Sequence, residues 1–306
     1  MARIFMLLGI VMLACVIIAG NVSAQNLFAE TGQVIYNGSS IDTAGLKIGG
    51  WGSGSCEESN INTYSGSRSL KITPKDLYAG GRVDFVNPID LTTAFNDPAM
   101  YLQLMCRFSG VQTGYDSWAV GVAAPNATDM YGGTGKTGKQ VKKLRLALYF
   151  EDGHSTESVV ELNGFKLGPD GWMGVSYPFA ALKGKLDLKE YKIKRLVVTG
   201  DGSEPFYIGE IHLFKDRTAF QPNAGDEQEV ARNYNIVFRG ECQSGATPMK
   251  YSWDFDDKDG IQEEAIGDLI YHRFNKAGEF TATLTVSDPF GVKESASTTV
   301  HVVVNQ

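Results

Sequence analysis

The stretch YSWDFDDKDG, residues 251–260, alternates between aromatic and polar side chains before it ends in an acidic sequence. Side chains two positions apart share one face of a β-strand, so Trp253 and Phe255 point to the same side. Asp254 and Asp256 then point the other way, towards solvent or a turn. The pattern predicts a strand that places large aromatic side chains in the core of a β-sandwich, with a turn directly after it.

The aspartates of this stretch allow three interpretations. One is a turn in which aspartate side chains accept hydrogen bonds from nearby backbone N–H groups. A second is a structural calcium site, because closely spaced carboxylate oxygens suit Ca²⁺. Its candidate ligands are Asp254, Asp256, Asp257 and Asp259. An EF-hand register fails, because Gly260 at the sixth loop position puts Phe255 at the first. A catalytic carboxylate pair is disfavoured, since the sequence implies no cleft or partner group.

Two further elements follow in order, IYHRF at 270–274 and AGEFTATLTVSD at 277–288. Together the three elements resemble the signature of the PKD domain, a surface module with an immunoglobulin-like β-sandwich fold. The matching residues are Tyr251, Trp253, Asp254, Phe255, His272, Phe274, Ala277, Gly278, Phe280, Leu284, Val286 and Asp288. The resemblance covers about residues 220–304 and implies an immunoglobulin-like sandwich there.

The rest of the chain also has the pattern of an all-β protein. Short runs of β-branched and aromatic residues alternate with clusters of Gly, Asn, Asp and Ser, and long helical periodicity is absent. Composition becomes polar over residues 215–233, so we predict a domain boundary that divides 25–216 from 217–306. A net charge of −7 and a pI near 5.2 provide no basic field for nucleic acid.

The N-terminal part more loosely resembles the galactose-binding-like jelly roll of many carbohydrate-binding modules. The matching stretches are TYSGSRSLKI at 63–72, GWMGVSYPFAAL at 171–182 and IKRLVVTGDGSEPFYIGEIHLF at 193–214. The resemblance implies a β-sandwich that binds carbohydrate, and structural calcium in the last stretch. The candidate calcium ligands are Glu210 in this stretch, which stands where the family often has an aspartate, and Glu30 near the start of the module.

Exposed aromatic side chains are the groups that would identify a sugar site, because their faces stack on the C–H surface of a pyranose ring. The candidate platforms are Trp51, Tyr78, Trp118 and Tyr131. Ordinary packing is the alternative for each. Trp172 lies in a stretch that carries the fold resemblance, so we expect it in the core.

The first 24 residues have the features of a secretory signal peptide: a positive Arg3, an apolar run, and small residues before Gln25. The alternatives are an uncleaved membrane anchor and a lipoprotein lipidated at Cys15. No later apolar run is long enough to span a membrane. We therefore expect a secreted protein.

Three cysteines follow the signal sequence: Cys56, Cys106 and Cys242. An odd number leaves at least one unpaired within the chain. Cys56 and Cys106 fall in one predicted domain and could form a disulfide. The alternative is that Cys106 is a buried small apolar residue.

No catalytic motif accompanies these features. The four histidines are scattered without metal-ligand spacing, and no nucleophile motif appears. We predict a secreted, non-enzymatic surface or matrix protein that binds polysaccharide through its N-terminal module. The alternative is a structural protein whose modules contact cell-surface or matrix proteins without binding sugar.

Overall fold

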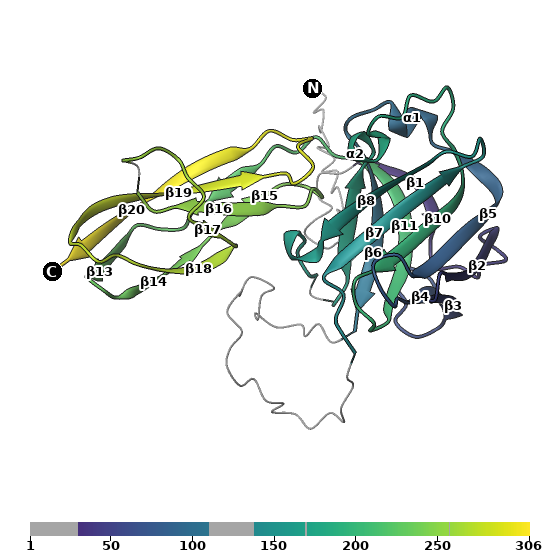
Figure 1. Ribbon diagram of the computed structural model, residues 1–306, viewed down its shortest axis with the longest axis horizontal. Helices are drawn as coiled ribbons and strands as arrows, with labels where there is room; N and C mark the ends of the chain where they lie inside the picture. The colour runs from purple at the N-terminus through teal and green to yellow at the C-terminus, as the bar shows by residue number, and fades with distance from the viewer. Residues whose placement is uncertain (1–29, 110–137, 169, 257) are drawn as a thin grey trace, which may run out of the picture.

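The computed structural model describes residues 30–109, 138–168, 170–256 and 258–306. The chain folds into two β-sandwich modules joined end to end (Figure 1). The N-terminal module is a jelly-roll sandwich and the C-terminal module is an immunoglobulin-like one. No helix in the described part of the chain has the length and apolar character that a membrane span needs.

The N-terminal module consists of two antiparallel sheets packed face to face. The first has the order β3-β4-β11-β6-β9, with β1 also paired to β11. Its strands are β1 (Glu30–Tyr36), β3 (Ser55–Ser59), β4 (Ser69–Thr73), β6 (Met100–Phe108), β9 (Met173–Pro178) and β11 (Phe206–Lys215). The second has the order β2-β5-β10-β7-β8. Its strands are β2 (Leu46–Trp51), β5 (Gly80–Asp90), β7 (Lys143–Phe150), β8 (Ser155–Glu161) and β10 (Lys192–Gly200).

Strand β7 shows why the second sheet has one apolar and one polar face. Leu144, Leu146 and Leu148 alternate along it, and all three are fully buried in the core between the sheets. The intervening side chains, which include Arg145 and Tyr149, therefore lie on the opposite, outer face. Three short helical segments connect strands of this module: α1 (Thr92–Phe95), η1 (Leu162–Gly164) and α2 (Phe179–Lys183).

The C-terminal module has a five-stranded sheet of order β13-β20-β19-β16-β17 and two smaller two-stranded sheets. The larger sheet contains β13 (Gln228–Ala231), β16 (Lys250–Asp254), β17 (Ala265–Ile266), β19 (Gly278–Ser287) and β20 (Ala296–Asn305). Strand β14 (Asn235–Arg239) pairs with β18 (Leu269–Arg273), and β12 (Gln221–Asn223) pairs with β15 (Glu241–Gln243). Strand β13 runs parallel to β20, and the other pairs are antiparallel.

Trp253 forms the centre of the C-terminal core. It is fully buried, its ring lies 5.3 Å from that of Phe238, and its indole N–H donates a hydrogen bond to Gly267 O at 3.0 Å. Phe255 is also buried and stacks on His272 at 3.7 Å between ring centroids. Both aromatics face the core as predicted, although β16 ends at Asp254 and Phe255 follows directly after it.

Direct contacts join the two modules. Tyr101 and Phe214 of the first module pack with Ala246 of the second, and Thr247 Oγ1 hydrogen-bonds Tyr101 OH at 3.0 Å. Phe290, from the loop between β19 and β20, packs against the N-terminal core. The junction between the modules therefore contains a small apolar cluster that is separate from the two module cores.

Candidate functional site

The outer face of the sheet β2-β5-β10-β7-β8 is the best candidate for a binding site. Its strand registers place outward-facing residues in three rows that cross all five strands. The first row contains Trp51, Gly80, Thr199, Arg145 and Val159; the second Gly49, Arg82, Val197, Ala147 and Glu157; the third Lys47, Asp84, Arg195, Tyr149 and Ser155. We call these fifteen residues the outer face. Small, charged and aromatic residues are interspersed on it.

Two aromatic side chains meet across this face. The rings of Trp51 and Tyr149 lie 5.3 Å apart and the Arg195 guanidinium lies 5.7 Å from the Trp51 ring. Strands β2 and β7 are three strand spacings apart, roughly 14 Å. The two side chains must therefore extend over the strands between them. At Gly80 of β5, beside Trp51, a Cβ would come 2.6 Å from Val198 O, so glycine allows the close approach of β10 at this point.

Tyr78 adds a third aromatic side chain at the edge of the outer face. It lies on the turn before β5 and is 63% exposed, and its ring lies 5.1 Å from the Arg145 guanidinium. The turn is fixed because Asp76 Oδ1 accepts the Tyr78 N–H at 2.8 Å and Thr199 Oγ1 donates to Leu77 O at 2.5 Å. The structure thus brings together Trp51 and Tyr78, the two predicted platforms in the described residues.

Three arginines share two carboxylates on this face. Arg195 Nε donates to Asp84 Oδ1 at 2.5 Å, and Arg145 donates to Glu157 through Nε at 3.0 Å and through Nη2. Arg82 Nε is 3.4 Å from Asp84 Oδ2, but the geometry makes no hydrogen bond. Arg82 Nε and Arg145 Nη1 are both buried, and neither has a hydrogen-bond partner among the described residues.

Sequence reasoning missed Tyr149 and these arginines. A signal for them was available in the alternating strands. In KLRLALYF, the residues between the buried leucines face away from the core. That signal places Arg145 and Tyr149 on the outer side of β7. It does not say which residues of other strands lie beside them, because strand order and register come from long-range pairing.

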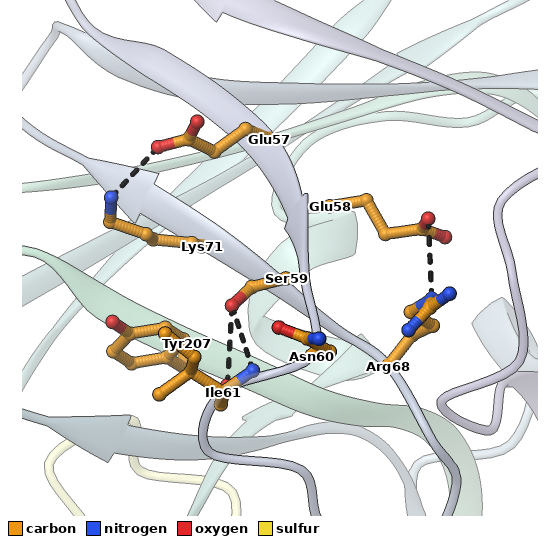
Figure 2. Close-up of a pocket in the computed structure, with 8 residues that line it drawn as sticks. All are labelled: Glu57, Glu58, Ser59, Asn60, Ile61, Arg68, Lys71 and Tyr207. Carbon is orange, nitrogen blue, oxygen red and sulfur yellow. Dashed lines mark hydrogen bonds and ion pairs between the residues drawn. The ribbon is translucent and has the colours of Figure 1, made fainter.

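A second, shallow hollow lies at the edge of the other sheet. Its volume is about 320 Å³ and Figure 2 shows its lining. The lining residues are Glu57, Glu58, Ser59, Asn60, Ile61, Arg68, Lys71 and Tyr207. Lys71 pairs with Glu57 at 2.8 Å and Arg68 with Glu58 at 3.5 Å, so its four charges neutralise one another. The hollow offers a ligand one aromatic ring and little unpaired charge.

The acidic turn after β16 is organised by hydrogen bonds from the backbone. Asp254 is buried, and its carboxylate accepts the N–H groups of Asp256 at 3.0 Å and Gln262 at 2.9 Å. Asp256 accepts the N–H of Lys258 at 3.1 Å. The prediction of an Asx-bonded turn is confirmed, since both oxygens of the buried aspartate already have donors.

The structure does not gather the candidate metal ligands into one site. Nowhere in the described residues do three His, Cys, Asp or Glu side chains come together as a metal would require. Glu30 pairs with Lys215, five residues along β11 from Glu210, or roughly 17 Å. Glu210 Oε1 instead lies 2.9 Å from His212 Nδ1, and this contact is the main cause that lowers the pKa of the Glu210 carboxyl group. Calcium binding stays a prediction for both modules.

The predicted disulfide between Cys56 and Cys106 is wrong. Both are free thiols buried in the N-terminal core, and Cys242 is a free buried thiol in the C-terminal one. Cys56 on β3 and Cys106 on β6 are separated by three strand spacings, roughly 14 Å. A disulfide requires Cα atoms within about 7 Å. The alternative of buried small apolar residues describes both.

Some predicted residues fall outside the described part of the chain, namely the signal sequence, Trp118, Tyr131 and Asp257. Trp172 is 4% exposed and its ring packs 5.2 Å from that of Tyr64, which confirms its place in the core.

Comparison with known proteins identifies the second module. Residues 219–304 match the family model of the PKD domain, so the C-terminal module is a PKD domain. No curated protein matches the sequence.

Two solved structures resemble the chain at low scores. One is a Clostridium thermocellum endo-1,4-β-D-xylanase 10B fragment with CBM22-1 and GH10 modules, complexed with xylohexaose. It has 12% identity and a TM-score of 0.29, and the match covers 67% of this chain and 33% of that one. The other is the M60 catalytic domain with two CBM51 domains of Clostridium perfringens ZmpB, with 12% identity, a TM-score of 0.19, and coverage of 91% and 22%. At such scores the ligand of the N-terminal module has to be argued from its own residues.

Proposed function

We propose that this is a secreted, non-enzymatic surface or matrix protein whose N-terminal module binds polysaccharide on the outer face. The observation that carries the proposal is the contact between the Trp51 and Tyr149 rings on this face, with the exposed Tyr78 at its edge. Aromatic faces stack on sugar C–H surfaces, and nearby polar groups bind the hydroxyls. The PKD domain then serves as a spacer that presents the binding module.

The outer face fits this role better than the hollow beside Tyr207. A sugar chain is long and flat, and the outer face offers several aromatic rings across five strands. The hollow offers one ring beside two pairs of mutually neutralised charges. Polar donors and acceptors of the outer face, such as Asp84 and Glu157, are partly exposed and can reach sugar hydroxyls.

A binding screen with a matched variant tests the proposal. The chain from Gln25 onward would be run through gels that contain neutral or acidic polysaccharides, beside Trp51→Ala and Tyr207→Ala proteins. We expect at least one polysaccharide to retard the wild type and the Tyr207→Ala control, and Trp51→Ala to migrate freely. If no polysaccharide retards the wild type, or if Trp51→Ala binds equally well, carbohydrate binding on this face is wrong.

The second candidate is an assembly role without sugar, and one observation favours it. Val237 and Tyr271 face each other across β14 and β18 of the PKD domain and are 44% and 59% exposed. Tyr234, near by in sequence, is 70% exposed. An exposed apolar group of this kind can contact another protein. Under this proposal Tyr271→Ser would abolish capture by a protein partner, whereas Trp51→Ala would leave it unchanged.

Export is part of the main proposal and has its own test. Cleavage after Ala24 would leave Gln25 as the first residue of the mature protein. N-terminal sequencing or intact mass of protein recovered outside the cell would show this end. A retained leader in the membrane fraction would instead favour the anchor.

A further inference from the structure

The outer face carries excess positive charge in a protein that is acidic as a whole. It holds four cationic residues, Lys47, Arg82, Arg145 and Arg195, and two acidic ones, Asp84 and Glu157, a surplus of two positive charges. The complete chain has a formal charge of −7. Local positive potential on an acidic protein attracts anionic ligands to that place.

Arg145 is unusually buried for a charged residue on the outer face of a sheet. Its side chain is 6% exposed, and Glu157, which takes its Nε and Nη2 protons, is 51% exposed. Nη1 is left buried without a partner among the described residues. A buried guanidinium donor without an acceptor costs free energy, because it has lost water and gained nothing. An oxygen supplied by a ligand would remove that cost.

Arg82, on the other side of β10, also has a buried guanidinium nitrogen that lacks an acceptor among the described residues. This nitrogen is Nε, which has no hydrogen-bond partner in the described part of the chain, although the Asp84 carboxylate lies 3.4 Å away. Asp84 already accepts the shorter hydrogen bond from Arg195 at 2.5 Å. Strands β5 and β7 are two spacings apart, roughly 10 Å, so the two arginines start from strands on either side of β10. Both are therefore within the area that the proposed sugar chain would cover.

We propose that the outer face recognises an acidic polysaccharide, whose anionic groups accept hydrogen bonds from Arg145 and Arg82. This inference rests on the proposed function and names its substrate class. Planar guanidinium groups suit carboxylate and sulfate oxygens, and such charge-assisted bonds are stronger than neutral ones. The Arg145 guanidinium lies 5.1 Å from the Tyr78 ring, which is 63% exposed, so only a solvent-exposed side chain stands over Arg145 on this side.

The test compares ligands that differ in charge alone. Polygalacturonate and its methyl ester share one sugar backbone, and the ester removes the negative charge. We expect polygalacturonate to bind at least about 10-fold more tightly than the ester, as expected for loss of a hydrogen bond to a charged group. A sulfated galactan and a neutral galactan complete the set. Tight binding of the sulfated polymer alone would support the anionic class with sulfate as its source.

Variants assign the effect to the arginines. Arg82→Gln removes a side chain that is 40% exposed, so the fold should tolerate it, and Arg145→Gln is the second variant. Arg107→Gln, on the other sheet, is the matched control. We expect Arg82→Gln and Arg145→Gln to weaken acidic binding about 10-fold each and to reduce the preference over the ester, whereas Arg107→Gln leaves both unchanged.

The outcomes separate this inference from the proposed function. Equal binding of each acidic polymer and its neutral counterpart, or unchanged preference in both arginine variants, would overturn the acidic class while sugar binding stands. Such a result would mean that water satisfies the two buried donors. If no polysaccharide in either set binds, the proposed function fails as well.

Discussion

Lys293 of the PKD domain donates a hydrogen bond to the buried carboxylate of Asp216 at the end of the N-terminal module, at 2.7 Å. The same ammonium group donates to Thr218 O at 2.8 Å and Ser244 O at 2.9 Å. Asp288 positions the loop, since its carboxylate accepts the backbone N–H of Lys293 at 3.1 Å. A residue of the PKD signature thus holds the lysine that joins the modules.

Replacing Lys293 by methionine should destabilise the junction. The change leaves the Asp216 side chain, which is 1% exposed, as an uncompensated buried charge, at a cost of about 3–5 kcal/mol. Calorimetry would show a lower melting temperature or two separate transitions. The control Lys250→Met breaks an exposed pair with Glu263 and should cost less than about 1 kcal/mol. Equal effects of the two changes would contradict a buried junction.

The Asp216 pair should also make stability depend on pH. Burial raises the pKa of Asp216, but the hydrogen bonds from Lys293, Thr218 and Ala246 outweigh it, and the pKa is lowered below its ordinary value of 3.8. The group therefore stabilises the fold above pH 3.8, and this contribution is lost as the pH falls through the lower folded-state pKa. We expect the gap in melting temperature between wild type and Asp216→Asn to narrow in this acid range. A gap that stays constant with pH would refute the linkage.

His272 should produce a second pH effect at milder acidity. Burial against Phe255 lowers its pKa below 6.5, and the Glu264 charge opposes this only in part. The unfolded chain then binds a proton that the folded chain does not, so stability falls as the pH drops below 6.5. Denaturant unfolding between pH 7 and 5 measures the slope. His272→Phe should flatten it, and an unchanged slope would assign it to other groups.

The hydrogen bonds of the turn after β16 lead us to expect that Asp254→Ala lowers the free energy of unfolding. The substitution removes the acceptor for the N–H groups of Asp256 and Gln262, so we expect a loss of about 1–3 kcal/mol. Because the effect comes from hydrogen bonds, it should be equal with and without a chelator. A wild-type melting temperature that falls on addition of chelator would instead show that the turn, or Glu210, binds calcium.

The three buried thiols should be unreactive in the native protein. Burial raises the pKa of Cys56 to about 12, and also raises the pKa of Cys106 and Cys242. The thiolate is the reactive form, so labelling by maleimide should be slow until the chain unfolds. Intact mass after denaturation should then show three labels on the chain from Gln25. Fewer than three labels on unreduced protein would instead support a disulfide between two of the cysteines.

Local patterns predicted the parts of this protein that depend on neighbouring residues. Alternation around Trp253 gave the core side of β16, and alternation in β7 gave the buried leucines. The Asx-bonded turn at Asp254 followed from the hydrogen-bonding habit of aspartate. Each of these needs only the period-two geometry of a strand or a turn of a few residues.

Pairing between distant strands decided everything that requires two segments to meet. Cys56 and Cys106 both face the core as single residues, yet the strand order keeps them three spacings apart. The same order brings Trp51 over the sheet to Tyr149, about a hundred positions later, and leaves Arg82 Nε and Arg145 Nη1 without hydrogen-bond acceptors among the described residues. The sequence by itself determined which faces the side chains take, because that is local. Only the tertiary structure decided which of them become neighbours, because register and strand order are set by the burial of the whole core.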